Sequence, residues 1–204
     1  MNPPWVKICG LTRPDDVEAS IRSGADAIGL VLVARSPRRI GAQRASELAA
    51  ISAGRAQVVL LVDGAADVAL TTARRVGADA VQPYGAAAVA IASAALATGL
   101  DVLFPVPVAD DLDIDIGRVP AGARPLLDTA VGESSGGTGV SFAWERARGF
   151  LGIVIAGGLA PHNVAAAVSA ARPWGVDASS GLEAAVGVKD HGKVSSFIEA
   201  AKSA

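Results

Sequence analysis

Two apolar segments of the sequence end in residues that could carry out acid–base chemistry. One ends in KICG at residues 7–10, and another, far along the chain, ends in LLDT at residues 126–129. Cys9 is either a small buried hydrophobic residue or a base, because a nearby cation such as Lys7 would lower the pKa of its thiol. Lys7 could instead pair with an inward-facing aspartate. Asp128 is either a loop anchor or a general acid whose pKa is raised by desolvation.

Arginine-rich and glycine-rich segments are the candidate anion-binding groups. RSPRR at residues 35–39 is either a solvated charge run or a clamp for a carboxylate or phosphate, which guanidinium groups bind bidentately. AGGL at 156–159 and DASSG at 177–181 are either tight turns or a backbone phosphate site, because small residues let N–H groups approach a ligand. GGTG at 136–139 is neither a Walker A motif nor a Rossmann fingerprint, and its loop of about 13 residues predicts a lid.

The composition limits the classes of protein that these residues can belong to. The 204 residues are 51% hydrophobic and 19% charged, which predicts one folded domain over residues 1–204. The net charge of −2 offers no footprint for nucleic acid or for an anionic membrane surface. One cysteine excludes an intramolecular disulfide, and no ligand cluster indicates a metal site. Without a signal peptide or a bilayer-spanning apolar stretch, we expect a soluble, cytoplasmic protein.

Short apolar runs alternate with longer alanine-rich segments. The apolar residues within a run are mostly continuous, which is typical of parallel strands covered on both faces. We expect strands at residues 6–9, 27–33, 58–62, 80–82, 102–106, 125–128, 152–156 and 175–178. We expect helices at residues 14–23, 42–51, 65–76, 86–97, 162–171 and 193–201, the first capped by Thr12. Residues 110–122 should hold an irregular or shortened helix, and another helix should begin near Phe142.

A faint repeat gives the number of strand–helix units. GADAI at residues 24–28 and GADAV at residues 77–81 are nearly identical, and each follows a helix and enters a strand. The interval between them accommodates two units, so the whole chain accommodates about eight. Eight units predict an α/β fold, a single (β/α)8 TIM barrel, with an open doubly wound sheet as the alternative. The active site of such a barrel lies at the carboxyl ends of the strands, where the candidate residues are found.

The order of these motifs along the whole chain resembles that of the phosphoribosylanthranilate isomerase family of tryptophan biosynthesis. The matching segments are KICGLT at 7–12, SPR at 36–38, LLDT at 126–129, GGTG at 136–139, FAW at 142–144, AGGL at 156–159 and DASSGLE at 177–183. The resemblance implies a cofactor-independent Amadori rearrangement of N-(5-phosphoribosyl)anthranilate to 1-(2-carboxyphenylamino)-1-deoxyribulose 5-phosphate. The only partner it implies is this small-molecule substrate. Nothing in the composition requires an oligomer, so we expect a monomer, with a dimer as the alternative.

The resemblance also implies roles for individual residues. Cys9 would be the general base, Asp128 the general acid, and Arg38 the residue that holds the anthranilate carboxylate. Asp177 would lie near the ribose hydroxyls. The phosphate-binding backbone would be formed by Gly157, Gly158, Ser180 and Gly181.

One segment departs from the family pattern, and two other interpretations stay open. Where the family usually has Gln-x-His-Gly followed by acidic residues, this chain has QPYGAA at residues 82–87. Tyr84 could still form an aromatic wall for the anthranilate ring, with Lys7 as a further supporting residue. A related isomerase that serves both histidine and tryptophan synthesis would have a carboxylate in place of Cys9. A catalytically silent phosphosugar-binding barrel would need neither Cys9 nor Asp128.

Overall fold

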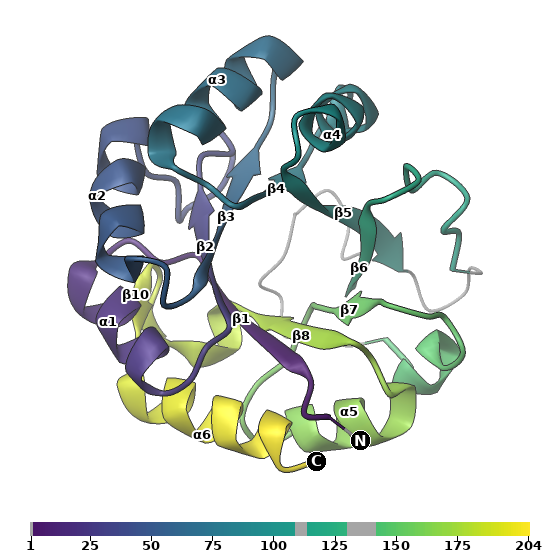
Figure 1. Cartoon of the computed structure of the whole chain (residues 1–204). Helices are drawn as coiled ribbons and strands as arrows, with labels where there is room; N and C mark the ends of the chain where they lie inside the picture. The colour runs from purple at the N-terminus through teal and green to yellow at the C-terminus, as the bar shows by residue number, and fades with distance from the viewer. Residues whose placement is uncertain (1, 109–113, 130–141) are drawn as a thin grey trace.

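The chain folds into a closed barrel of parallel strands, seen from one end in Figure 1. The computed structural model describes residues 2–108, 114–129 and 142–204. Eight strands follow one another around the barrel in chain order, and β8 pairs with β1 to close it. Their bounds are β1 Trp5–Cys9, β2 Ala27–Val31, β3 Gln57–Val62, β4 Ala80–Pro83, β5 Asp101–Val108, β6 Arg124–Thr129, β7 Val154–Ile155 and β8 Gly175–Ala178. The closure confirms the predicted barrel and rules out the open doubly wound sheet.

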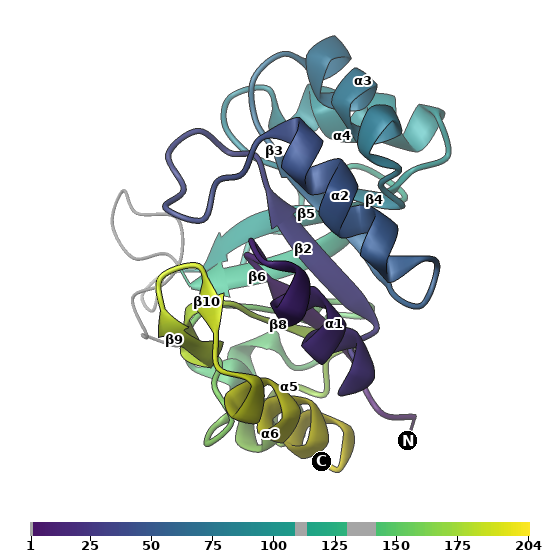
Figure 2. The ribbon, with the colours of Figure 1, turned by 90° about the vertical axis from the view of Figure 1, so that its left-hand side faces the viewer.

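Helices cover the outside of the barrel (Figures 1 and 2). Those in the described part of the chain are α1 Pro14–Arg22, α2 Ala42–Ser52, α3 Ala66–Val76, α4 Ala88–Ala97, α5 Val164–Ala171 and α6 His191–Lys202. Each lies where the sequence predicts, with ends that differ by at most two residues. The structure adds a small antiparallel hairpin between β8 and α6, formed by β9 (Glu183–Ala185) and β10 (Val188–Lys189).

Side chains alternate between the two faces of each strand, and this alternation determines which polar groups enter the barrel. One apolar cluster lies between the strands and the helices, and a smaller one lies inside the barrel. Leu126 of β6 belongs to the inner cluster, so Asp128, two residues further on, faces the same way. Cys9 at the end of β1 belongs to the inner cluster as well. The two acid–base candidates therefore project into the same interior from different strands.

The Thr12 cap predicted for α1 is wrong. Arg13 occupies the N-cap position without a side-chain hydrogen bond. The Thr12 hydroxyl instead donates to the carbonyl oxygen of Gly187, at 2.6 Å. Gly187 lies in the turn of the β9–β10 hairpin, so a tertiary contact competes with the local cap and replaces it.

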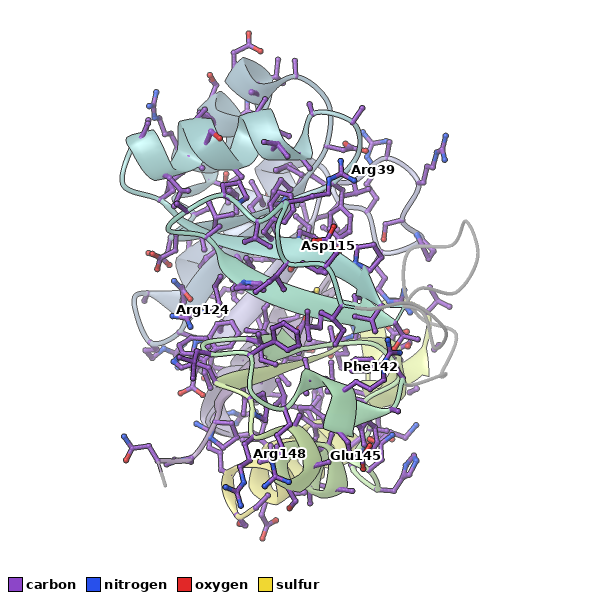
Figure 3. All side chains as sticks on the ribbon, turned by 90° about the vertical axis from the view of Figure 1, so that its right-hand side faces the viewer. Arg39, Asp115, Arg124, Phe142, Glu145 and Arg148 are labelled. Atoms are coloured by element: carbon purple, nitrogen blue, oxygen red, sulfur yellow. The ribbon has the colours of Figure 1, made fainter. Side chains whose placement is uncertain are left out.

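The helices expected after β5 and β6 are also wrong within the described residues. Residues 114–123 form turns and loops, because Gly117, Pro120 and Gly122 interrupt any helical pattern there. Near Phe142 only the short 3₁₀ helix Trp144–Ala147 forms. Phe142 itself is buried in the core (Figure 3). The GGTG segment expected to form a lid lies outside the described residues. In the described part of the chain, no helix is long and apolar enough to cross a membrane.

Candidate active site

A pocket opens at the carboxyl ends of the barrel strands, and most of the predicted site residues line it. They come from segments far apart in the sequence, which the barrel brings together. The predicted residues that line the pocket are Cys9, Arg38, Tyr84, Asp128, Gly157, Gly158, Asp177 and Ser180. Two predicted residues do not line it. Lys7 is fully buried, and Gly181 comes close to the Leu159 backbone.

Lys7 is buried inside the barrel as part of an ion pair. Its Nζ donates to Asp177 Oδ2 at 2.7 Å and to Gln82 Oε1 at 2.9 Å. Burial lowers the pKa of Lys7, but the charges of Asp177 and Cys9 outweigh it and the net shift is upward. The predicted pairing of Lys7 with an inward-facing aspartate is thus confirmed. Among the described residues, the other oxygen of that carboxylate, Asp177 Oδ1, is buried without a hydrogen-bond partner, so it can accept one from a ligand.

The orientation of the Gln82 amide follows from its two neighbours. A lysine can only donate, so the Gln82 atom that faces Lys7 is Oε1. Gln82 Nε2 then donates to the hydroxyl oxygen of Tyr84 at 2.7 Å. Burial, together with the charge of Asp128, raises the pKa of Tyr84 well above its usual value. The phenol therefore keeps its proton, which is directed away from Gln82 and is available to a ligand in the pocket.

The Cys9 thiol packs closely against β2. Its register partner on that strand is Gly29, and a Cβ atom added to Gly29 would lie 2.7 Å from Cys9 Sγ and 3.1 Å from Lys7 Cε. Burial raises the pKa of the Cys9 thiol, and the attraction of Lys7 lowers it by less, so the net shift is upward. The lowering by Lys7 was expected from the sequence. The larger effect of burial follows only from the fold.

Asp128 is a carboxyl group with a raised pKa. Burial first, and then the charge of Asp177, raise the pKa of Asp128 to about 6, although Lys7 lowers it. Gly157 at the end of β7 makes room for this carboxyl group. Its φ is 83°, and a Cβ atom there would lie 2.8 Å from Asp128 Oδ1 and 2.6 Å from the backbone nitrogen of Thr129. Only glycine fits this position, whether or not its backbone also binds a ligand.

Only one of the three arginines at residues 35–39 enters the pocket. Arg35 and Arg39 are exposed, and Figure 3 shows Arg39 at the surface. Arg38 lines the pocket and forms a two-fold hydrogen bond with Glu183. The bond to Glu183 raises the pKa of Arg38. The interpretation as a solvated charge run therefore holds for two of the arginines, whereas Arg38 is placed to meet a ligand.

The loops after β7 and β8 present backbone groups to the pocket. Gly157 and Gly158 both have positive φ angles, 83° and 66°. Asn163 holds this turn, because its Nδ2 donates to the Gly158 carbonyl at 2.9 Å and its Oδ1 accepts from Ala160 N at 2.8 Å. After β8, Ser180 begins a short 3₁₀ helix. Such glycine-rich turns are typical of anion sites in barrels, because small residues let backbone N–H groups approach a ligand.

Four residues of the site received no role from the sequence. A glycine inside a strand often marks a close approach of another chain segment, and this signal could have identified Gly29. Gln82 and Glu183 act through partners that are distant in sequence, Lys7 and Arg38, so only the fold reveals them. Lys189 acts through Glu183, six residues earlier, which the β9–β10 hairpin places opposite it.

A closed parallel barrel whose pocket holds a thiol and a carboxyl group at the strand ends defines a (β/α)8-barrel enzyme with an acid–base site. Comparison with known proteins narrows this class. The family model for N-(5′-phosphoribosyl)anthranilate (PRA) isomerase matches residues 6–200. A protein of that name from Rubrobacter xylanophilus is 40% identical over 203 residues, which cover 97% of this chain and 98% of that protein. The one from Haloferax volcanii is 38% identical over 209 residues, covering 98% and 93%.

Solved structures agree with this result. Phosphoribosyl anthranilate isomerase from Thermotoga maritima superposes with a TM-score of 0.88 at 32% identity, covering 98% of this chain and all of that one. Another structure of the isomerase, in complex with reduced 1-(o-carboxyphenylamino)-1-deoxyribulose 5-phosphate, superposes with a TM-score of 0.83 at 31% identity and the same coverage. The chain belongs to the N-(5′-phosphoribosyl)anthranilate isomerase family. Its activity is the isomerisation of phosphoribosylanthranilate in tryptophan biosynthesis.

Gly29 offers a test of the packing around the thiol. Gly29→Ala is expected to destabilise the fold by about 1–3 kcal/mol, the usual effect of overpacking a core. Displacement of the thiol is expected to lower turnover about tenfold or more. Gly41→Ala is the control for turnover, because a Cβ atom at Gly41 meets nothing within 4 Å; its own loss of stability should stay at about 1 kcal/mol or less, because Gly41 is the N-cap of α2. Thermal unfolding and steady-state rates would check both variants. If Gly29→Ala melted at the wild-type temperature and kept the wild-type turnover, the close contact between Gly29 and Cys9 would be contradicted.

Proposed function

We propose that Asp128 is the general acid and Cys9 the general base of the Amadori rearrangement. Asp128 protonates the furanose ring oxygen, and the ring opens to a Schiff base between the anthranilate nitrogen and C1. The Cys9 thiolate then removes the proton from C2, which gives an enolamine. The enolamine tautomerises to the ketone, with one proton added at C1 and one lost from the C2 hydroxyl. Protons therefore balance over the cycle, and each positioned group contributes a factor of about 10²–10⁴.

One observation carries this proposal: a thiol from β1 and a carboxyl group from β6 line the same pocket. The carboxyl group has a pKa of about 6, so it can hold a proton near neutral pH. The dual histidine and tryptophan isomerase is less well supported, because the first strand ends in Cys9 rather than in a carboxylate. A catalytically silent barrel would have no need for both groups in one pocket.

The polar groups around the pair support one orientation of the substrate. Arg38 binds the anthranilate carboxylate, because it is the arginine of its loop that lines the pocket. Asp177 accepts a hydrogen bond from a ribose hydroxyl through its unpartnered Oδ1. The phosphate binds at the loops after β7 and β8, whose residues line the pocket. The residues proposed for this site are Gly157, Gly158, Ser180 and Gly181, the last of which shapes the loop through its close approach to the backbone of Leu159.

Lys7 and Tyr84 support the reaction without transferring the substrate protons. Lys7 is a buried cation that favours the thiolate form of Cys9. Tyr84 forms a wall of the pocket and presents its hydroxyl proton to the anthranilate half of the substrate, opposite the phosphate loops. The phenol thus takes the place of the imidazole that the family usually carries there.

A fluorescence assay with Tyr84→Phe tests the proposed role of the Tyr84 hydroxyl in the pocket. Phosphoribosylanthranilate generated in situ should lose its fluorescence rapidly with the wild-type protein. Tyr84→Phe should lower kcat/KM about fivefold, the effect of one neutral hydrogen bond. Restoring the family's residue in Tyr84→His is the control, since it keeps a ring and a donor. No activity of the wild-type protein would contradict the acid–base roles. An unchanged kcat/KM in Tyr84→Phe would reduce Tyr84 to an apolar wall.

We also propose that residues 1–204 act as one catalytic domain and as a monomer in the cytoplasm, with no cofactor and no nucleic-acid or membrane partner. All eight barrel strands are in this chain, and the described residues that line the pocket all come from it. The name of one similar Thermotoga maritima structure describes monomers made from a dimeric isomerase, so both states occur among similar proteins. Sedimentation of the purified protein would distinguish a monomer from a dimer.

A further inference from the structure

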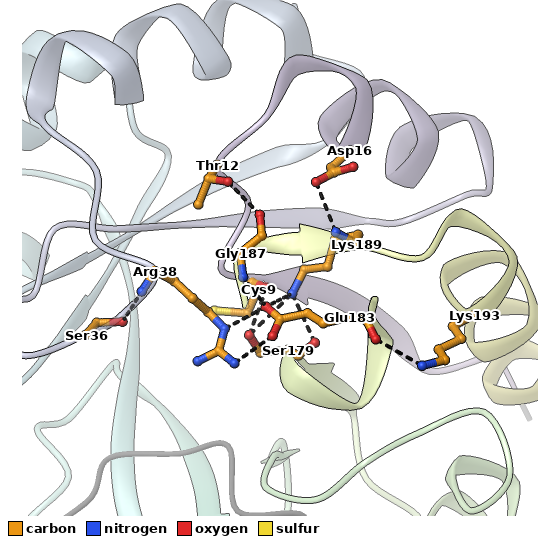
Figure 4. Close-up of polar contacts among 10 residues, drawn as sticks. All are labelled: Cys9, Thr12, Asp16, Ser36, Arg38, Ser179, Glu183, Gly187, Lys189 and Lys193. Carbon is orange, nitrogen blue, oxygen red and sulfur yellow. Dashed lines mark hydrogen bonds and ion pairs between the residues drawn. The ribbon is translucent and has the colours of Figure 1, made fainter. Parts of the chain in front are cut away.

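The β9–β10 hairpin places a carboxylate against Arg38 (Figure 4). Glu183 begins β9 and pairs across the hairpin with Lys189 of β10. Glu183 Oε1 accepts from Arg38 Nε at 2.7 Å, and Glu183 Oε2 accepts from Arg38 Nη2 at 2.8 Å. Lys189 Nζ lies 3.1 Å from the same Oε1. One carboxylate therefore holds two cations at the edge of the pocket that Arg38 lines.

This two-fold hydrogen bond determines which part of the guanidinium group faces the pocket. A guanidinium has five N–H donors and can meet a carboxylate through Nε and one Nη, or through both Nη atoms. Glu183 occupies the first of these two edges. The second edge, formed by Nη1 and the remaining hydrogen of Nη2, bonds to no residue in the described part of the chain. Because the Arg38 side chain is only 12% exposed, this second edge is reached through the pocket.

The Glu183 carboxylate is itself held in place. Its side chain is 6% exposed, and its Oε1 accepts a further hydrogen bond from Gly187 N at 3.2 Å. Thr12 Oγ1 ties the hairpin to the loop after β1 through the Gly187 carbonyl. Lys193 Nζ donates to the Glu183 carbonyl oxygen at 2.9 Å. On the other side, the Arg38 stem lies against Gly10, where a Cβ atom would come within 2.5 Å of Cδ.

The pairing does not remove the attraction for an anion. Arg38 and Lys189 bring two positive charges to one negative charge on Glu183, so the cluster keeps a net positive charge. Lys189 Nζ is also anchored by the Ser179 carbonyl at 3.0 Å, so it stays behind the arginine rather than replacing it. The cluster thus combines a fixed orientation with a positive potential toward the pocket.

We propose that Glu183 is a positioning residue for recognition of the substrate's aromatic carboxylate. It holds the Nε edge of Arg38 so that the two Nη atoms meet that carboxylate side by side. The proposal rests on the proposed function, in which Arg38 binds the carboxylate. Glu183 does not touch the substrate and acts only through Arg38.

Two ligands and two variants test this proposal. The ligands are reduced 1-(o-carboxyphenylamino)-1-deoxyribulose 5-phosphate and its phenylamino analogue, which lacks the carboxyl group. Glu183→Asp keeps the charge but shortens the side chain, whereas Glu183→Gln keeps the length but removes the charge. Both variants are expected to weaken the first ligand about tenfold, the scale of a charge-assisted hydrogen bond, and to leave the second unchanged. Titration calorimetry would measure the dissociation constants.

Glu18→Asp is the matched control. Glu18 also forms a two-fold bond with an arginine, through Nη1 and Nη2 of Arg55 at 3.1 Å and 2.7 Å, but on the outer surface, so both affinities should keep their wild-type values. Arg38→Met serves as the reference for the loss of the whole carboxylate contact. If Arg38→Met weakens only the carboxylate ligand while Glu183→Asp changes neither, the positioning role is wrong and the role of Arg38 stands. If Arg38→Met leaves the affinity for the carboxylate ligand unchanged, the positioning role of Glu183 and the carboxylate-binding role of Arg38 are both wrong.

Other outcomes also overturn the proposal. Equal weakening of both ligands by Glu183→Asp would make Glu183 a structural residue only. Tighter binding of the carboxylate ligand by Glu183→Gln would mean that Glu183 merely neutralises charge. Arginine side-chain NMR of the wild-type protein needs no variant that must fold. The Arg38 Nε–H signal should be protected from exchange before ligand is added, and the Nη signals should become protected only with the carboxylate ligand. Protection of neither Nε–H nor Nη would contradict the fixed edge.

Discussion

Cys9→Ala is expected to lower kcat by about 10²–10⁴-fold, the contribution of a positioned base. The substitution removes one sulfur atom from a buried side chain, so the barrel should remain folded. Arg38 and the loops after β7 and β8 stay intact, so the reduced product should bind with nearly wild-type affinity. Loss of substrate fluorescence at saturating concentration would give kcat, and a titration with the reduced product would give the affinity.

Cys9→Ser separates the acid–base role of the thiol from its volume. A serine hydroxyl fits the same space but does not ionise in the range where a thiol does, so it cannot supply the base. We expect this variant to be nearly as inactive as Cys9→Ala. Retention of more than about a tenth of the wild-type kcat in either variant would remove Cys9 from the role of base. An affinity for the reduced product that falls in parallel with kcat would indicate a binding defect instead of lost chemistry.

The sequence predicts the barrel well because the signal for each strand is local. A continuous apolar run such as residues 58–62 can be buried only if both faces are covered, and a parallel barrel covers both. The alternation of side chains then places Cys9 and Asp128 on the inner face. The sequence does not show whether a polar side chain will hydrogen-bond to a nearby backbone group or to a residue far along the chain. Thr12 has the type and position of a helix cap, yet it bonds to Gly187, which is 175 residues away.

The ion pairs and pKa values of the site also depend on residues that are far apart in the sequence. Lys7 could be read as a neighbour of Cys9 or as half of an ion pair, and the closure of β1 on β8 makes it both. The raised pKa of the thiol could not be predicted, because burial of the end of β1 outweighs the effect of the lysine two residues away. Glu183 was visible only as part of a family motif, since its arginine partner lies 145 positions earlier in the chain.

The kcat/KM of the wild-type enzyme is expected to rise with pH through about 6 and then to stay level until the thiol ionises. Burial and the charge of Asp177 place the pKa of Asp128 at about 6, whereas burial raises the pKa of Cys9 above its usual value. As the pH rises, Asp128 therefore loses its proton first. Between the two pKa values the pair holds one proton, which rests mainly on the thiol.

The reactive form carries that one proton on Asp128 and leaves Cys9 as the thiolate. This form is a minor tautomer of the one-proton state, so its share is constant wherever the pair holds one proton. Below pH about 6 a second proton protonates both groups, and the share of the reactive form falls. Above the thiol pKa no proton is left for Asp128. Both the fall of kcat/KM below pH about 6 and its fall above the thiol pKa therefore reflect the protonation state of the Cys9–Asp128 pair.

Asp128→Asn removes the acid, so the thiol is the one group of the pair that still titrates, and the kcat/KM of the variant should keep rising with pH up to the thiol pKa. We expect kcat to fall by about 10²–10⁴-fold.

The phosphate of the substrate also ionises near pH 6, with a pKa of about 6. Its effect is common to both enzymes, so the ratio of the wild-type to the Asp128→Asn profile isolates Asp128. This ratio should be level below pH about 6 and fall above it, where Asp128 of the wild-type protein loses its proton. Asp115→Asn, which changes an exposed carboxylate, is the control and should keep the wild-type profile. A ratio that stays flat through pH 6 would assign the levelling of the wild-type profile to the substrate and would leave Asp128 without evidence of titration in the free enzyme. A small loss of kcat would take the acid role away from it altogether, because no rearrangement can begin until the ring oxygen is protonated.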